Sequence, residues 1–203
     1  MGRRVFNPEG LLWKPLGYVG ELVMLSLLWG VCSVPLVTIG PATAALYDCA
    51  VRNVRQGEDE LFARFFRTFK RELKPGALAT LLWALLLALP FGLYRLLIPS
   101  LAGSNAGRAL AVGTLVLFFF LTAVLVWVFP LLSRFTFGFA GLNRTAFRLA
   151  FGNILRSAAA ALIAGLGFAA CYFFTSPLIF VPGLAALLWS CLMEPVFRRY
   201  TGN

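Results

Sequence analysis

Long apolar runs separated by short polar segments dominate the hydrophobic pattern of this chain. The longest run, Leu110–Leu132, holds no charged residue over 23 positions. A run of 18 or more apolar residues can cross a hydrocarbon core about 30 Å thick as a helix, whereas a soluble helix of that length keeps a polar face. The pattern therefore predicts an all-α fold, a polytopic membrane helical bundle, in which residues 1–203 form a single integral membrane domain.

Five segments fit transmembrane helices by length and composition. The expected spans are residues 16–39, 77–97, 110–132, 157–175 and 178–197. Pro35 and the Gly40-Pro41 pair should end the first span, because proline removes a helical hydrogen bond. The chain is then expected to resume as a helix from Ala42 to Arg55. If the first segment re-enters the membrane instead of crossing it, four spans remain.

Residues 61–74 have a different pattern, with two faces at helical spacing. The apolar face consists of Leu61, Phe62, Phe65, Phe66, Phe69 and Leu73. The basic face consists of Arg64, Arg67, Lys70, Arg71 and Lys74. This pattern predicts an amphipathic cytoplasmic helix, and it suits two settings: the membrane interface or the surface of a partner protein.

The distribution of Lys and Arg along the chain predicts the orientation of the protein in the membrane. The chain is 60% apolar and 13% charged, with a net charge of +10, and soluble domains carry about 25% charged residues. Lys and Arg number seven in residues 48–76 and four in residues 133–156, but one in residues 98–108. The positive-inside rule then places the N-terminus outside the plasma membrane and the C-terminus in the cytoplasm. Anionic lipid headgroups are the expected partners of this charge, and nucleic acid is not.

A weak internal similarity suggests a parallel two-fold repeat. Phe65, Phe69, Leu73 and Lys74 match Phe147, Phe151, Leu155 and Arg156 at one constant offset. Chance agreement between phenylalanines in a chain that contains 20 of them is the alternative explanation.

Charges inside apolar segments are candidates for function, because each is costly in a membrane. The four in question are Glu21, Asp48, Arg95 and Glu194. Glu21 and Arg95 lie near the outer ends of their expected spans and are candidates for a pair across helices. Asp48 with Arg52, and Glu194 with Arg198, have the spacing of pairs one helical turn apart. Structural pairing is therefore preferred to ion coupling.

The sequence offers no site for catalysis, metal or cofactor. Histidine is absent, which removes the commonest general base. The four cysteines lie singly in apolar segments and form no Cys-x-x-Cys pair, so neither a zinc site nor a redox motif is indicated. We therefore expect no metal, no cofactor and no enzyme activity.

Two stretches carry a resemblance to a known family. The first comprises Pro35, Thr38–Ala42 and Ala44–Tyr47, and the second is Phe65–Arg71 before the second span. In these residues, and in length and span layout, the chain resembles the YesL-like family of bacterial integral membrane proteins, a domain of unknown function. The resemblance implies an accessory subunit in the bacterial inner membrane, associated with carbohydrate ABC-type uptake systems.

Four functions are compared on this basis. An accessory subunit would bind ABC transporter subunits, and the candidate partner-binding residues are Thr38, Gly40, Pro41, Phe65, Phe66, Arg67, Phe69 and Arg71. A small transporter or channel would need a polar cavity near the broken first helix. A membrane enzyme would need polar groups clustered at one depth. A purely structural role, with the Gly-Pro segment as a packed kink, is the simplest alternative. The sequence determines no substrate and no oligomeric state.

Overall fold

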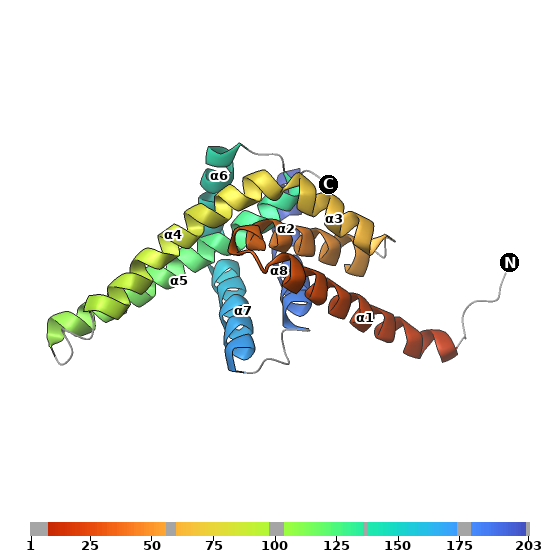
Figure 1. Ribbon diagram of the computed structural model, residues 1–203, viewed down its shortest axis with the longest axis horizontal. Coiled ribbons are helices and arrows are strands. Elements are labelled where there is room, and N and C mark those ends of the chain that lie inside the picture. Colours follow the sequence, from red (N-terminus) through yellow and green to blue (C-terminus); the bar gives the residue numbers. More distant parts are fainter. Residues whose placement is uncertain (1–7, 56–59, 98–103, 136–137, 174–179, 202–203) are drawn as a thin grey trace.

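A computed structural model describes residues 8–55, 60–97, 104–135, 138–173 and 180–201. The described chain is helical almost throughout, as Figure 1 shows, so the all-α class is confirmed. The helices are α1 (Pro8–Cys32), α2 (Ile39–Cys49), α3 (Leu61–Arg71), α4 (Leu73–Leu97), α5 (Asn105–Arg134), α6 (Phe139–Gly152), α7 (Ile154–Phe173) and α8 (Val181–Thr201). A short 3₁₀ turn, Leu36–Thr38, precedes α2, and a π-helical segment, Ala50–Arg55, follows it.

Two of these helices are long and apolar enough to cross a membrane. They are α4 and α5, which contain the expected spans 77–97 and 110–132. A third candidate is formed by α6 and the start of α7, two segments bent by 106° at their junction. Tyr18–Cys32 of α1 and Val181–Phe197 of α8 are shorter apolar helices. The chain is thus a membrane protein with two to three candidate spans, and the five-span arrangement stays a prediction.

The break after α1 lies earlier than the sequence suggested. We expected a span over residues 16–39, ended by Pro35 and the Gly40-Pro41 pair, but α1 ends at Cys32 and the chain turns at Ser33–Pro35. Gly40 and Pro41 lie in the first turn of α2. Proline is tolerated there, because the first backbone N–H groups of a helix have no intrahelical partner. Pro35, with extended backbone, marks the true break.

Helix α2 lies at the centre of the bundle (Figure 1). Every residue from Gly40 to Cys49 is buried, and α1, α3, α4, α5 and α8 all contact this helix. Ala42, Ala44 and Ala45 are fully buried. Such small side chains allow neighbouring helices to approach closely, which is how helices associate where water gives no hydrophobic driving force.

Indole hydrogen bonds tie the helices together within this apolar interior. Trp29 Nε1 donates to Thr43 Oγ1 at 3.1 Å, and Trp127 Nε1 donates to Ser157 Oγ at 2.8 Å. Two further bonds run from Trp83 Nε1 to Asn143 Oδ1 and from Trp189 Nε1 to the carbonyl of Ala160, each at 3.1 Å. Each bond joins two helices. An indole N–H without a hydrogen-bond partner would be costly in an apolar medium, and here each N–H instead links one helix to another.

Helices α4 and α5 form an antiparallel hairpin whose far half projects from the bundle (Figure 1). We call residues 88–97 and 105–119 the arm. Its large apolar side chains are mostly exposed: Leu89, Phe91, Leu93, Leu96, Val112, Leu115, Val116, Leu117, Phe118 and Phe119. In contrast, the C-terminal half of α5 is buried from Ala123 to Ser133 except for Leu125, which is half-buried. The bundle therefore has a packed centre and one long uncovered extension.

The proposed repeat matches α3 with α6, but the matched residues differ in environment. Phe65 of α3 is fully buried, whereas its counterpart Phe147 of α6 is 37% exposed. Phe147 instead contacts the rings of Trp83 and Phe120 at the side of the bundle. The parallel two-fold repeat stays a prediction.

Candidate functional site

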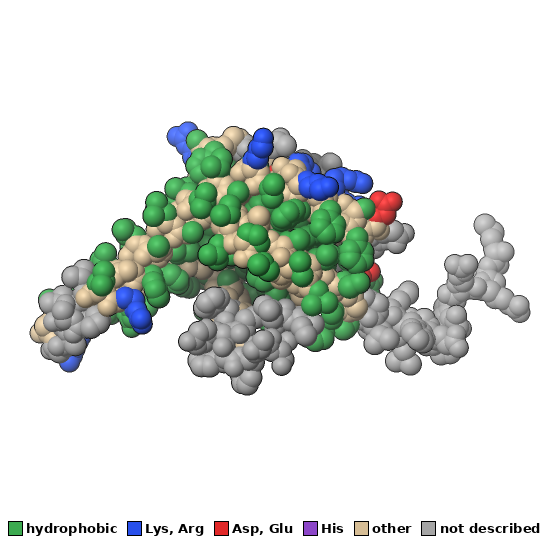
Figure 2. Space-filling view, viewed as in Figure 1, with side chains coloured by type: hydrophobic (Ala, Val, Ile, Leu, Met, Phe, Trp, Pro, Cys, Tyr) green, Lys and Arg blue, Asp and Glu red, His purple; other side chains and the backbone are tan. Residues whose placement is uncertain are grey.

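Basic side chains gather on one side of the molecule. Figure 2 shows Lys and Arg along the upper edge, over α6, α3 and the start of α4. We call this surface the basic face, and its exposed described members are Arg67, Lys70, Arg71, Lys74, Arg144 and Arg148. Arg95 and Arg108 lie at the far end of the arm instead, in the last turn of α4 and the first turn of α5. The two ends of the α4–α5 hairpin thus carry separate groups of cations.

Asp48 is held by two hydrogen bonds just beneath the basic face. Its Oδ1 accepts from Arg52 Nε at 3.0 Å, which is the expected pair. Its Oδ2 accepts from Thr68 Oγ1 of α3 at 2.9 Å. The carboxylate is buried while Arg52 is 40% exposed. Thr68 was not predicted, because the contact joins residues 20 apart in sequence and no local pattern marks it.

Glu194 of α8 pairs with a residue of α5. Arg134 Nε donates to Glu194 Oε1 at 3.0 Å, and Tyr47 Oη donates to the same oxygen at 3.5 Å. The expected partner, Arg198, has its side chain outside the described residues. Because Tyr47 precedes Asp48 on α2, the two buried acids lie at the same end of the bundle.

Arg71 joins α3 to α5 at this end. Its Nη2 donates to the carbonyl of Ser133 at 3.2 Å, and its Nε contacts Glu72. The three buried acids of this region, Asp48, Glu72 and Glu194, therefore each have an arginine partner. These paired charges, with the hydrogen bonds of Thr68 and Arg71, join α2, α3, α5 and α8 to one another.

Glu21 and Arg95 do not pair within the chain. Arg95 is exposed in the last turn of α4, at the far end of the arm, whereas α1 extends from the other side of the bundle (Figure 1). Glu21 Oε2 is buried and has no hydrogen-bond partner. The pair expected between these two residues is therefore not formed.

The Gly-Pro segment packs tightly against α4. Gly40 N–H donates to Thr80 Oγ1 at 3.0 Å, and a Cβ at Gly40 would lie 2.2 Å from that oxygen. The ring of Pro41 lies against Gly76. Thr38 Oγ1 donates to the carbonyl of Cys32 at 2.6 Å, across the turn. Buried Gly40 and Pro41 are therefore a packed helix crossing, and a partner has no access to them.

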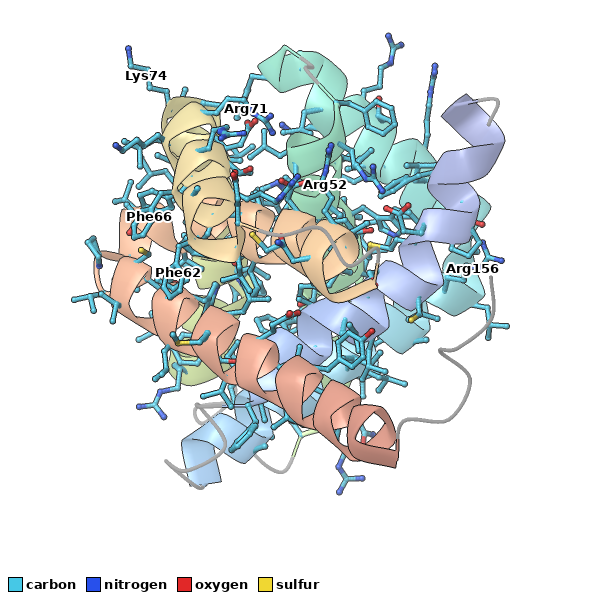
Figure 3. All side chains as sticks on the ribbon, turned by 90° about the vertical axis from the view of Figure 1, so that its right-hand side faces the viewer. Arg52, Phe62, Phe66, Arg71, Lys74 and Arg156 are labelled. Atoms are coloured by element: carbon cyan, nitrogen blue, oxygen red, sulfur yellow. The ribbon has the colours of Figure 1, made fainter. Side chains whose placement is uncertain are left out.

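Helix α3 presents its aromatic residues in two directions. Phe65 is fully buried and stacks on the half-buried Phe69, with ring centroids 6.3 Å apart. Phe62 and Phe66 are 48% and 42% exposed, and Figure 3 shows both on the outer side of α3. The surface open to a partner is therefore Phe62, Phe66, Arg67, Lys70 and Arg71, which we call the α3 surface.

A cavity of about 350 Å³ lies beside the centre of the bundle. Its walls come from α1, α2, α7 and α8, and they are Trp29, Thr43, Leu46, Ile163, Ala164, Gly167, Val181, Pro182, Ala185 and Trp189. Thr43 Oγ1 donates to the carbonyl of Ile39 and accepts from Trp29. Since the polar groups of the lining are engaged with the protein itself, this space is suited to apolar occupants, unlike the polar cavity expected of a transporter.

The described residues contain no cluster of His, Cys, Asp or Glu that could hold a metal ion. Cys49 is buried in α2, and burial, with a smaller effect of neighbouring Asp48, raises the pKa of its thiol to about 12. The thiol therefore stays protonated at neutral pH and is a poor nucleophile.

The comparisons with known proteins concern the first half of the fold. Residues 22–91 match a family model described as "Protein of unknown function, DUF624". The matched range runs from α1 through α2 and α3 into α4, and so contains the Gly40–Thr80 crossing and the α3 surface. No curated protein and no solved structure matches the chain. The description names no activity, and the YesL-like resemblance stays an expectation.

Proposed function

We propose that this chain is a non-catalytic, multi-pass protein of the plasma membrane that binds a partner protein through its α3 surface. The observation that carries the proposal is that α3 has one buried face and one exposed face. Buried Phe65 and Thr68 fix the helix to the bundle, whereas Phe62, Phe66 and Arg67 are exposed. Phenylalanine and arginine are both enriched at protein–protein interfaces relative to the rest of a protein surface.

The partner class comes from the resemblance and not from the geometry. A YesL-like protein is expected to accompany a carbohydrate ABC-type uptake system, so the partners would be membrane or ATP-hydrolysing subunits of such an importer. A cytoplasmic basic face is a suitable position for binding them. The excess of Lys and Arg on that side supports a cytoplasmic location of the basic face, because the positive-inside rule assigns such segments to the cytoplasm.

The topology that we propose has five crossings, with the N-terminus outside. Helices α4 and α5 cross in opposite directions, and α3 and α6 lie at the end of the bundle that carries the basic face (Figures 1 and 2). The C-terminal end of α8 lies at that same end (Figure 1). Helices α1, α7 and α8 supply the other crossings, although their apolar lengths alone do not require it.

The test is co-purification from native membranes with Phe66→Ser and Arg67→Glu introduced together. We expect the loss of importer subunits that the unchanged protein retains, because both side chains are exposed. Arg108→Glu makes the same charge change at the far end of the arm and serves as the matched control. If the double variant retains every partner while it is inserted normally, the α3 surface is not the binding site.

A further inference from the structure

The cavity beside the centre of the bundle, which we call the α7–α8 cavity, opens at the surface of the molecule. Thr43 and Leu46 of α2 form its floor and are buried. Trp29, Ile163 and Trp189 in its walls are only partly buried. Its volume of about 350 Å³ falls within the range of about 300–1,000 Å³ that is usual for small-molecule sites. The cavity is therefore both large enough for a ligand and accessible to one.

The polar side chains that line this cavity are already engaged. Trp29 Nε1 donates to Thr43 Oγ1, and Thr43 Oγ1 donates to the carbonyl of Ile39. Trp189 Nε1 donates to the carbonyl of Ala160 on α7. Among the described residues, the lining includes no charged side chain. A water molecule needs about two to four polar partners, so this lining favours an apolar occupant over water.

The helices beside the opening expose an apolar surface. Leucines of α7 and α8 next to the lining residues are exposed, namely Leu162, Leu166, Leu184 and Leu188. The chain carries no charged residue from 157 to 173 or from 181 to 193. In a membrane protein such a surface is covered by the acyl chains of the lipid. The opening of the cavity therefore faces lipid and not water.

The two helices place the cavity at the same depth. Ile163 lies nine residues beyond the start of α7 at Ile154, and Ala185 lies nine residues before the paired acid Glu194 on α8. Both distances are about 14 Å at 1.5 Å per residue, and the hydrocarbon core is about 30 Å thick. In Figure 1, α7 and the first half of α8 extend below α2, away from the basic face. If α7 and α8 cross as proposed above, the cavity lies near the middle of the bilayer.

We propose that the α7–α8 cavity binds one acyl chain of a membrane phospholipid, which packs against the indoles of Trp29 and Trp189. The chain enters from the surrounding lipid, and its headgroup stays outside the cavity. The bound chain gives the apolar walls the van der Waals contacts that an empty cavity lacks. The depth of this site rests on the proposed crossing of α7 and α8, whereas its chemistry does not.

Photo-crosslinking with a phosphatidylcholine that carries a diazirine at the end of one acyl chain tests this site. The neutral headgroup avoids attraction to the basic face. The protein is taken from nanodiscs that contain this lipid, washed in detergent to exchange surface lipid, and irradiated. We expect the retained lipid to label residues 163–167 and 181–189, as mapped by peptide mass spectrometry. The exposed arm binds lipid only at its surface and should lose its label in the wash.

Substitutions that fill the cavity supply the second part of the test. Ala164→Leu and Ala185→Leu add side-chain volume from α7 and from α8. Each should lower the label on the cavity walls about tenfold or more, because the added atoms occupy the space of the chain. Gly165→Leu is the matched control. Nothing lies within 4 Å of a Cβ at that position, so the label should be unchanged.

Two results would overturn the proposal. One is a label on the cavity walls that is washed away as readily as the label on the arm, because lipid would then cover only the surface. The other is an undiminished label in the filled variants. If one variant fails to fold, the other variant and the comparison of walls with arm in the unchanged protein still decide. No importer subunit takes part in these measurements, so a negative result leaves the proposed role of the α3 surface unaffected.

Discussion

At the scale of single residues, Gly40 shows how closely α2 and α4 approach. A Cβ at this position would lie 2.6 Å from Phe129 Cε1 and 2.8 Å from the carbonyl oxygen of Gly76. The backbone N–H of Gly40 is also one of the free donors at the start of α2, and Thr80 satisfies it from the facing helix. Glycine is therefore required here for space, and not for an unusual backbone conformation.

Gly40→Ala should lower the free energy of unfolding by about 1–3 kcal/mol, because an added methyl group forces the two helices apart. Gly30→Ala on α1 is the matched control. Nothing lies within 4 Å of a Cβ there, and alanine is the better helix former by about 0.5–1 kcal/mol. Unfolding in mixed detergent micelles measures both variants. An alanine at residue 40 as stable as the parent protein would contradict the crossing described here.

The sequence predicted the charge pair within one helix, but not the pair between distant helices. The bond from Arg52 to Asp48 joins residues four apart on one helix, and that spacing identifies it. The bond from Arg134 to Glu194 joins residues 60 apart. No sequence pattern relates two residues that far apart, so the sequence did not predict this pair. Local geometry is encoded in local sequence, whereas contacts between distant helices depend on how the helices pack.

At the scale of elements, α3 combines two tasks on one short helix. The amphipathic pattern over residues 61–74 predicted the helix correctly, although the helix ends at Arg71 and α4 begins at Leu73. The pattern did not show which phenylalanines face the bundle. Phe65 is buried and Phe66 is exposed, because α2 covers only part of the apolar stripe. Partner binding must therefore be tested at Phe66, since changes at Phe65 disturb folding.

Phe65→Ala should destabilise the protein by about 3–5 kcal/mol, because it empties a fully buried site between α2 and α3. Phe66→Ala, one residue further along, should cost much less, because that ring is 42% exposed. Thermal unfolding followed by monodispersity on a sizing column compares the two variants. Equal losses of stability would show that α3 does not pack in the orientation found here.

At the scale of the whole molecule, the two groups of cations mark opposite ends of the α4–α5 hairpin. Lys74 lies in the first turn of α4, and Arg108 lies in the first turn of α5. Twenty-four residues of helix span about 36 Å at 1.5 Å per residue, enough to cross the hydrocarbon core. The two cations should then lie on opposite sides of the membrane.

Single cysteines at these two positions test the proposed orientation. In a background without the four native cysteines, Arg108→Cys should react with an impermeant maleimide on intact spheroplasts. Lys74→Cys should react only after the membrane is made permeable. The reverse pattern would place the N-terminus in the cytoplasm. Reaction of both from one side would mean that α4 and α5 do not cross.

The sequence alone determined the class of this protein, because the length and composition of an apolar run decide whether a helix suits a membrane. It also determined α4, α5 and the amphipathic helix, each of which is encoded in a continuous segment. Only the tertiary structure decided that the break lies at Ser33–Pro35, that α2 is enclosed on all sides, and which charges are paired. The reason is physical: these features depend on contacts between segments far apart in the chain, and periodicity within one segment contains no information about its neighbours in space.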